Sequence, residues 1–165
     1  MRVPIRKGGE FSDLRPDPKM TKKKFEELSL RLQKIKEIIR PRQASDVKKY
    51  AADGDFSENA AYQIAKGKLR RTNQELKELE DLLGKAEIIH PNSKKTIQVG
   101  HSVSLGFNGQ EIKYQILGSV ETDPSKGVIS HSSPLGQLLL DKKVGDIIEL
   151  KTEERNIKYQ VLKIE

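Results

Sequence analysis

Residues 52–62 read Ala52-Asp53-Gly54-Asp55-Phe56-Ser57-Glu58-Asn59-Ala60-Ala61-Tyr62. The Asp-Gly-Asp run is typical of a chain reversal, because Gly accepts a positive φ and Asp readily caps a helix. On both sides of this run, apolar residues recur at helical spacing. Two helices joined by so short a turn must lie antiparallel. The sequence therefore predicts a helical hairpin whose tip carries two acids, Asp55 and Glu58.

The helix before the reversal begins after Thr21, which is suited to an N-cap. Steps of three and four separate its apolar residues, as in a coiled-coil seam: Phe25, Leu28, Leu32, Ile35 and Ile39. Pro41 is expected to kink the helix or loosen one turn, after which smaller residues continue the stripe at Ala44, Val47 and Ala51. The second helix carries a matching seam: Tyr62, Ala65, Leu69, Thr72, Leu76, Leu79, Leu83 and Ala86. Helices of about 32 residues predict a hairpin roughly 45–50 Å long.

After Pro91 the apolar period changes from helical to alternating, which indicates antiparallel strands. The alternating runs are 103–107, 112–116, 148–150 and 157–161. Ser133-Pro134 supplies an N-cap and a first-turn proline for one short helix through Leu140. The predicted fold class is α+β with two domains, an antiparallel coiled coil over 20–90 and a small antiparallel sheet domain with one short helix over 91–165. A flexible arm over 1–19 precedes them.

Composition narrows the class of protein. The net charge of +7 comes mostly from the first 90 residues, which suggests a chain that touches nucleic acid, RNA or DNA, without wrapping it. There is no Cys, and His90, His101 and His131 are too scattered to indicate a zinc site. No segment approaches the roughly 20 apolar residues of a membrane span. We expect a cytoplasmic protein with no membrane partner.

The two tip acids also have a purely structural interpretation. Asp55 followed three residues later by Glu58 resembles a capping box, in which both side chains satisfy N–H groups at the start of the second helix. Acids at a helix start also interact favourably with the helix dipole. Spacing alone favours capping and leaves a catalytic role open.

Residues 52–60 and Tyr62 resemble the tip motif of the Gre transcript-cleavage factors, GreA and GreB. The usual form of that motif is Gly-Asp-hydrophobic-Ser-Glu-Asn-Ala-acid-Tyr. Further matches follow in order along the chain: Arg40-Pro41, Glu121-Thr122-Asp123, Gly127-Val128-Ile129-Ser130, Ser133-Pro134-Leu135-Gly136, Leu138-Leu139 and Lys142-Lys143-Val144-Gly145-Asp146. The resemblance covers about residues 20–165, and so many ordered matches are more specific than one motif.

The resemblance implies a bacterial transcription elongation factor that acts as a monomer on RNA polymerase. Its coiled coil would enter the secondary channel, while an FKBP-like domain holds the outer rim. Asp55 and Glu58 would then share a second Mg²⁺ at the polymerase active site and orient a water that attacks backtracked RNA. Carboxylates suit Mg²⁺, and one protein need not supply all the ligands. The free factor would bind no metal and would be no enzyme alone.

Three features depart from the family pattern or leave it undecided. Ala61 stands where the family usually has Glu or Asp, so the tip has one carboxylate fewer. Residues 1–19 have no counterpart in the common core. Phe56 leaves open whether cleavage is GreA-like or GreB-like. Because of these departures, an alternative stays open: a regulator that occupies the same channel and inhibits RNA polymerase without promoting cleavage.

A basic run with no acid among its members follows the tip: Lys66, Lys68, Arg70 and Arg71, with Lys48 and Lys49 expected nearby on the facing helix. A solvated helix face explains such a run as well as an RNA contact does. The resemblance implies that the run attracts the 3′ part of the nascent RNA, with Lys66 the best positional match. A plain coiled-coil adaptor that binds nucleic acid through residues 66–71 is a further alternative.

Three residues beside the acids are candidates for tip support. Ser57 and Asn59 could orient the acids or cap the helix, and Tyr62 lies on the seam, where core packing is the commoner role. The FKBP-like resemblance also raises prolyl isomerase activity. Such pockets are lined by several aromatic residues, and this domain offers mainly Phe107, Tyr114 and Tyr159, so we disfavour that activity.

Overall fold

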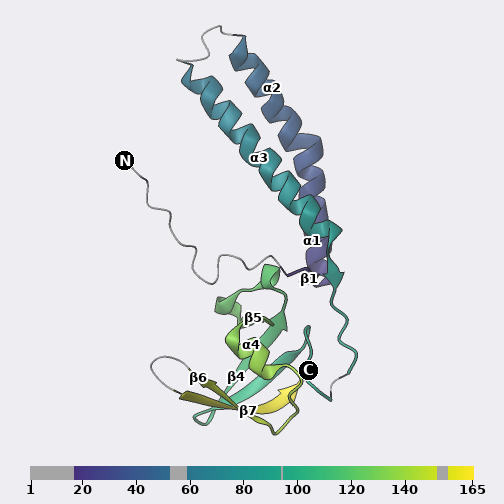
Figure 1. Cartoon of the computed structure of the whole chain (residues 1–165), viewed down its shortest axis with the longest axis vertical. Helices are drawn as coiled ribbons and strands as arrows, with labels where there is room; N and C mark the ends of the chain where they lie inside the picture. Colours follow the sequence, from purple (N-terminus) through teal and green to yellow (C-terminus); the bar gives the residue numbers. More distant parts are fainter. Residues whose placement is uncertain (1–16, 53–58, 94, 152–155) are drawn as a thin grey trace, which may run out of the picture. The chain divides into compact units, whose positions relative to one another are not determined.

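The structure is a computed structural model that describes residues 17–52, 59–93, 95–151 and 156–165. The chain divides into two compact units, one of residues 20–88 and one of residues 1–19 with 89–165. The first is the helical hairpin and the second contains the sheet (Figure 1). Within the described residues, no helix combines the length and apolar character needed to cross a membrane.

The first arm of the hairpin is one continuous helical path in three parts. α1 spans Lys22–Lys34, a π-helical turn η1 spans Ile35–Ile39, and α2 spans Arg40–Ala51. Thr21 is the N-cap of α1, and its side chain accepts a hydrogen bond from the N–H of Lys24, as the sequence predicted. The predicted loosened turn ends at Ile39, two residues before Pro41. Proline has no N–H to bond back along the helix, and the wider turn accommodates this loss.

The second arm is α3, Ala60–Gly84, which runs beside α2 (Figure 1). Its 25 residues correspond to about 37 Å, so this helix is shorter than the predicted 32 residues. The predicted seams are confirmed, because every seam residue is buried or half-buried. The most buried are Leu28, Ile35, Ala65, Thr72 and Leu79. Two short strands flank this hairpin in the sequence, β1 (Lys19–Met20) before it and β2 (Glu87–Ile88) after it, and they pair with each other.

The other unit is built on a five-stranded sheet in the order β5-β4-β3-β7-β6. Its strands are β3 (Ser102–Phe107), β4 (Gln110–Leu117), β5 (Val128–Ser130), β6 (Ile147–Lys151) and β7 (Asn156–Ile164). Three of the four pairings are antiparallel, but β5 pairs with β4 in parallel. The four predicted strands therefore pair antiparallel as expected, and β5, which the sequence analysis did not predict, makes the sheet mixed. A crossover through two 3₁₀ turns, η2 (Ser119–Glu121) and η3 (Pro124–Lys126), makes the parallel pairing possible.

One core holds this unit together. The helix α4, Pro134–Leu139, begins at the predicted N-cap Ser133, whose hydroxyl accepts a hydrogen bond from the N–H of Gly136 at 3.0 Å. Leu139 carries the helix into the core, where the buried apolar side chains are Ile97, Val103, Leu105, Ile116, Leu139, Ile148, Tyr159, Val161 and Ile164. The ring of Phe107 packs on that of Tyr159, with centroids 5.4 Å apart. These aromatic residues therefore contribute to core packing.

Candidate functional site at the end of the hairpin

The predicted tip acids Asp55 and Glu58, with Ser57, lie outside the described residues. The structure does describe where the chain leaves one helix and enters the next. α2 ends at Ala51, and α3 begins at Ala60 with Asn59 as its N-cap. A capping box would assign the N-cap to Asp55, so that interpretation is wrong for the start of α3. A catalytic role for the two acids stays a prediction.

Asn59 bonds to both helices with one side chain. Its Oδ1 accepts a hydrogen bond from the N–H of Tyr62 at 2.9 Å, and its Nδ2 donates to the carbonyl of Tyr50 at 3.0 Å. Tyr62 is half-buried in the seam, and the Nζ of Lys66 lies 5.8 Å from the centre of its ring. A cation at that distance is attracted by the ring quadrupole. After the tip, the chain therefore begins with an N-cap residue that is hydrogen-bonded to both helices. It continues with a lysine whose ammonium group lies near an aromatic ring.

The predicted basic residues all lie in exposed positions: Lys48 and Lys49 on α2, and Lys66, Lys68, Arg70 and Arg71 on α3. Around them the charge is strongly unbalanced. Residues 40–51 and 60–74, which form the tip half of the hairpin, carry eight basic side chains and one acidic side chain. Residues 22–39 and 75–84, the base half, carry seven of each. Excess positive charge is therefore confined to the half of the hairpin that adjoins the tip.

Ion pairs follow the same division. Arg31 pairs with Glu75, and Lys36 with Glu80 at 2.6 Å, so both cross-helix pairs found among the described residues lie in the base half. Among residues that the structure describes, none of the eight cations of the tip half forms an ion pair. Nor does any group of three His, Cys, Asp or Glu side chains in the described part of the chain lie where it could hold a metal ion. The tip half presents positive charge that its own side chains leave uncompensated.

Comparison with known proteins assigns both units. Residues 18–88 match the family model described as "Transcription elongation factor, N-terminal", and residues 92–165 match "Transcription elongation factor, GreA/GreB, C-term". The GreA of Novosphingobium aromaticivorans is 38% identical over 144 residues, which cover 86% of this chain and 90% of that protein. The chain belongs to the GreA/GreB family.

Other GreA/GreB relatives agree over nearly the same span. The GreA of Macrococcus caseolyticus is 36% identical over 83% of this chain and 89% of its own length. The GreA of Metamycoplasma arthritidis is 32% identical over 86% and 91%, respectively. Among solved structures, GreA factor homolog 1 of Thermus thermophilus is 25% identical, covers 88% of this chain and 97% of that chain, and gives a TM-score of 0.41.

The structure describes the surroundings of Ala61, the residue that departs from the Gre tip motif. Ala61 is exposed in the first turn of α3 and lines a shallow groove between α2 and α3. The other lining residues are Gln43, Asp46, Tyr50, Ile64, Ala65 and Lys68. The acid that the family usually has here would add a carboxylate to this groove, beside Asp46.

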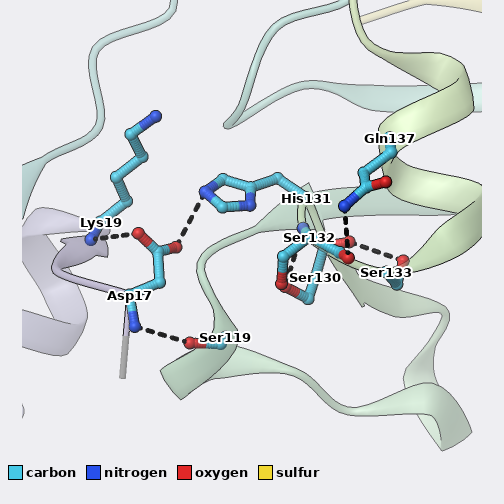
Figure 2. Close-up of polar contacts among 8 residues, drawn as sticks. All are labelled: Asp17, Lys19, Ser119, Ser130, His131, Ser132, Ser133 and Gln137. Carbon is cyan, nitrogen blue, oxygen red and sulfur yellow. Dashed lines mark hydrogen bonds and ion pairs between the residues drawn. The ribbon is translucent and has the colours of Figure 1, made fainter. Parts of the chain in front are cut away.

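A polar cluster in the sheet-containing unit was not predicted from the sequence (Figure 2). His131 Nε2 lies 2.9 Å from Asp17 Oδ2, and no other donor among the described residues bonds that buried oxygen. The N–H of Asp17 donates to the hydroxyl of Ser119 at 3.2 Å. Residues 1–16 of the predicted flexible arm lie outside the described residues, but Asp17 and Lys19 have definite partners. No local sequence pattern could indicate this cluster, because Asp17 and its partners are more than 100 residues apart.

The loop that resembles the second-domain loop of the Gre factors is held by its own bonds. The carboxylate of Asp123 accepts hydrogen bonds from Lys126 Nζ at 2.8 Å and from the Ser125 hydroxyl at 2.5 Å. The bond from Lys126 is the main cause that lowers the pKa of Asp123, and the bond from Ser125 adds to it. Gly127 takes the positive φ of 72° that leads the chain into β5. The turn therefore presents an ionised Asp123 at the protein surface.

Proposed function

We propose that this protein binds RNA polymerase through the secondary channel and stimulates endonucleolytic cleavage of backtracked nascent RNA, rescuing arrested complexes. Family membership supports a role in transcription elongation with RNA polymerase. The finer proposal rests on one observation, a long hairpin that joins a motif with two acids to a half with eight cations and one acid. Such a hairpin can carry carboxylates to a site on another protein while its positive flank attracts RNA.

In this mechanism Asp55 and Glu58 supply hard oxygen ligands. Two carboxylates are too few for a complete Mg²⁺ site, so the fit is to an ion shared with the polymerase. That ion would activate the water or stabilise the leaving oxygen of the phosphodiester bond. The factor then lends ligands and has no turnover of its own. It would work as a monomer in the bacterial cytoplasm, with residues 91–165 holding the rim of the channel.

The basic residues would attract the 3′ segment of the RNA. Lysines and arginines on exposed helix faces bind phosphates rather than read bases, so the attraction would be independent of sequence and weakened by salt. Lys66 is favoured for this contact because its ammonium group is supported by the ring of Tyr62.

The main test introduces the substitutions Asp55→Asn and Glu58→Gln, singly and together. Each variant is added to arrested elongation complexes that contain radiolabelled RNA. Each change removes a charge and preserves size, so binding to polymerase should persist while shortening of the RNA falls by at least 100-fold in the double variant. Raised Mg²⁺ should partly rescue the single variants by mass action. Asp81→Asn, which removes an exposed acid from the base half of the hairpin, is the matched control and should cleave normally. Full cleavage by the double variant would refute the mechanism.

A second test addresses RNA attraction. Lys66 and Lys77 are both exposed on α3, and their spacing of 11 residues gives them nearly the same face. Lys66→Gln should slow cleavage several-fold and reduce its salt dependence, whereas Lys77→Gln, in the neutral base half, should change neither. Equal effects of the two changes would mean that the positive half has no special role.

The alternative is a regulator that occupies the same channel and inhibits without cleavage, and Ala61 is the observation that favours it. Wild-type protein would then slow RNA synthesis without shortening the transcript. Ala61→Glu separates the two functions further, because an added carboxylate should raise cleavage at low Mg²⁺ if the tip recruits the ion. Slowed synthesis with no shortening by either protein would select the inhibitor.

A further inference from the structure

The end of the hairpin brings together two helix ends, each of which has backbone groups without partners inside its own helix. At the end of α2, the N–H of Ala52 bonds two carbonyls of the last turn. The carbonyl of Tyr50 in that turn accepts instead from the amide of Asn59. At the start of α3, the N–H of Tyr62 bonds the oxygen of the same amide. One side chain therefore satisfies a backbone group on each helix.

Few side chains could make both bonds. The bond to Tyr62 needs an acceptor and is made equally well by Ser, Asp or Asn at an N-cap. The bond to Tyr50 needs a donor that reaches the other helix, and the amide nitrogen of Asn59 spans that gap at 3.0 Å. Capping therefore explains only half of what Asn59 does. Its second bond crosses between the helices.

We propose that Asn59 is a positioning residue: its cross-helix bond fixes the separation of the two chain ends between which Asp55 and Glu58 lie. This inference rests on the proposed function, because it concerns the acids assigned to cleavage. Carboxylates that share an ion with another protein must arrive at a set distance and angle. A displacement of about 1 Å can slow an enzymatic step on the order of 100-fold. Loss of the bridge should therefore reduce cleavage while leaving polymerase binding intact.

The test uses Asn59→Ser and Asn59→Asp, which retain an N-cap acceptor and lose the amide donor. Because one variant is neutral and the other charged, a shared effect cannot come from charge. The matched control is Thr21→Ala, which removes the N-cap of α1 in the same hairpin and leaves the tip unchanged. Both Asn59 variants should shorten RNA at least 10-fold more slowly, and Thr21→Ala should stay within 2-fold of wild type. An unchanged rate in both Asn59 variants would overturn the proposal.

A readout independent of cleavage uses the free protein. The chain contains no Cys, so Ala52→Cys and Ala60→Cys, both exposed and on either side of the tip, carry a spin-label pair without background. The label-to-label distance distribution should broaden in Asn59→Ser and stay narrow in Thr21→Ala. Broadening together with a wild-type protein that cleaves no RNA would refute the proposed function and support the bridge. Normal cleavage with an unbroadened distribution would refute the bridge and support the function.

Discussion

The hairpin and the sheet-containing unit achieve stability in different ways. In the sheet unit, nine buried apolar side chains from strands, helix and loops form one cluster. In the hairpin, buried side chains follow one another along a single seam, and the cross-helix ion pairs lie on exposed faces. A thin seam stabilises less than a cluster, because each residue has fewer buried neighbours. The sheet unit can therefore lose surface contacts with little loss of stability. The hairpin depends on its seam for stability, and the exposed faces of its tip half can carry uncompensated positive charge.

The largest difference should appear when the same substitution is made in both regions. Leu105 is fully buried in the sheet core, whereas Leu79 is 9% exposed in the hairpin seam. Leucine-to-alanine changes in cores cost about 2–5 kcal/mol. We expect Leu105→Ala near the top of that range and Leu79→Ala near the bottom, because the seam can close around the smaller side chain. Hydrogen exchange followed by mass spectrometry would report the two regions separately. Equal losses would mean that the seam is packed as densely as the core.

Glycine-to-alanine changes should have opposite signs in the two units. A Cβ at Gly118 would lie 1.7 Å from the carbonyl oxygen of Lys19, so Ala at position 118 must displace the backbone at Lys19. Overpacking of this kind costs about 1–3 kcal/mol. A Cβ at Gly67, inside α3, meets nothing within 4 Å, and Ala there should stabilise the helix by about 0.5–1 kcal/mol. Denaturant midpoints measure both changes, and a stable Gly118→Ala protein would show that the segment moves aside freely.

Ion pairing should contribute little, even in the half of the hairpin that has it. Arg31 and Glu75 are 61% and 40% exposed, so solvent screens their attraction. A double-mutant cycle with Arg31→Gln and Glu75→Gln should give a coupling of about 0.2–1 kcal/mol at low salt and almost none at 1 M salt. A coupling that persists at 1 M salt would indicate a geometry protected from solvent.

The smallest effect should come from the exposed charges at the end of β7. Hydrogen bonds from Lys113 and then Lys163 lower the pKa of Glu165 from 4.5 to about 2. A lowered pKa in the folded state stabilises the fold above pH 4.5, and this contribution is lost as the pH falls through about 2. Glu165→Gln should therefore lower the melting temperature by no more than about two degrees at pH 7. The difference from wild type should shrink below pH 4.5 and vanish near pH 2.

Local, periodic features were predictable from the sequence. The seams, the N-caps Thr21 and Ser133, and the disturbed turn at Pro41 depend on residues within one or two turns of each other. Strand β5 was missed, because three residues show no alternation and the parallel pairing with β4 depends on a crossover. A two-residue turn at Asn108-Gly109, with φ of 49° and 78°, joins β3 to β4 and has a sequence signal that the prediction did not use.

In the candidate site, too, some features were predictable from local spacing and others were not. Exposure of Lys66 and Arg70 follows from their position off the seam, and the structure agrees. The bond between Asn59 and Tyr50 joins residues nine positions apart on different helices, so helical spacing could not predict it. The same holds for Asp17 and His131, which only the folded sheet unit brings together. Side-chain pairs across elements depend on packing, which single-sequence patterns do not specify.

The π turn at Ile35–Ile39 bears on how the gene for such a hairpin can change. One extra residue in a long helix rotates everything beyond it by about 100°, which would turn the seam of α2 away from α3. Here the wide turn holds one residue more than an α-helical turn, and seam residues before and after it, Leu32 and Ala44, are both half-buried. Loss of one codon at this turn would convert it to an ordinary α-helical turn and leave both seams in register, whereas a further codon would rotate α2 by about 100°. Single-residue deletions in this hairpin should therefore be tolerated best at this turn, away from the tip.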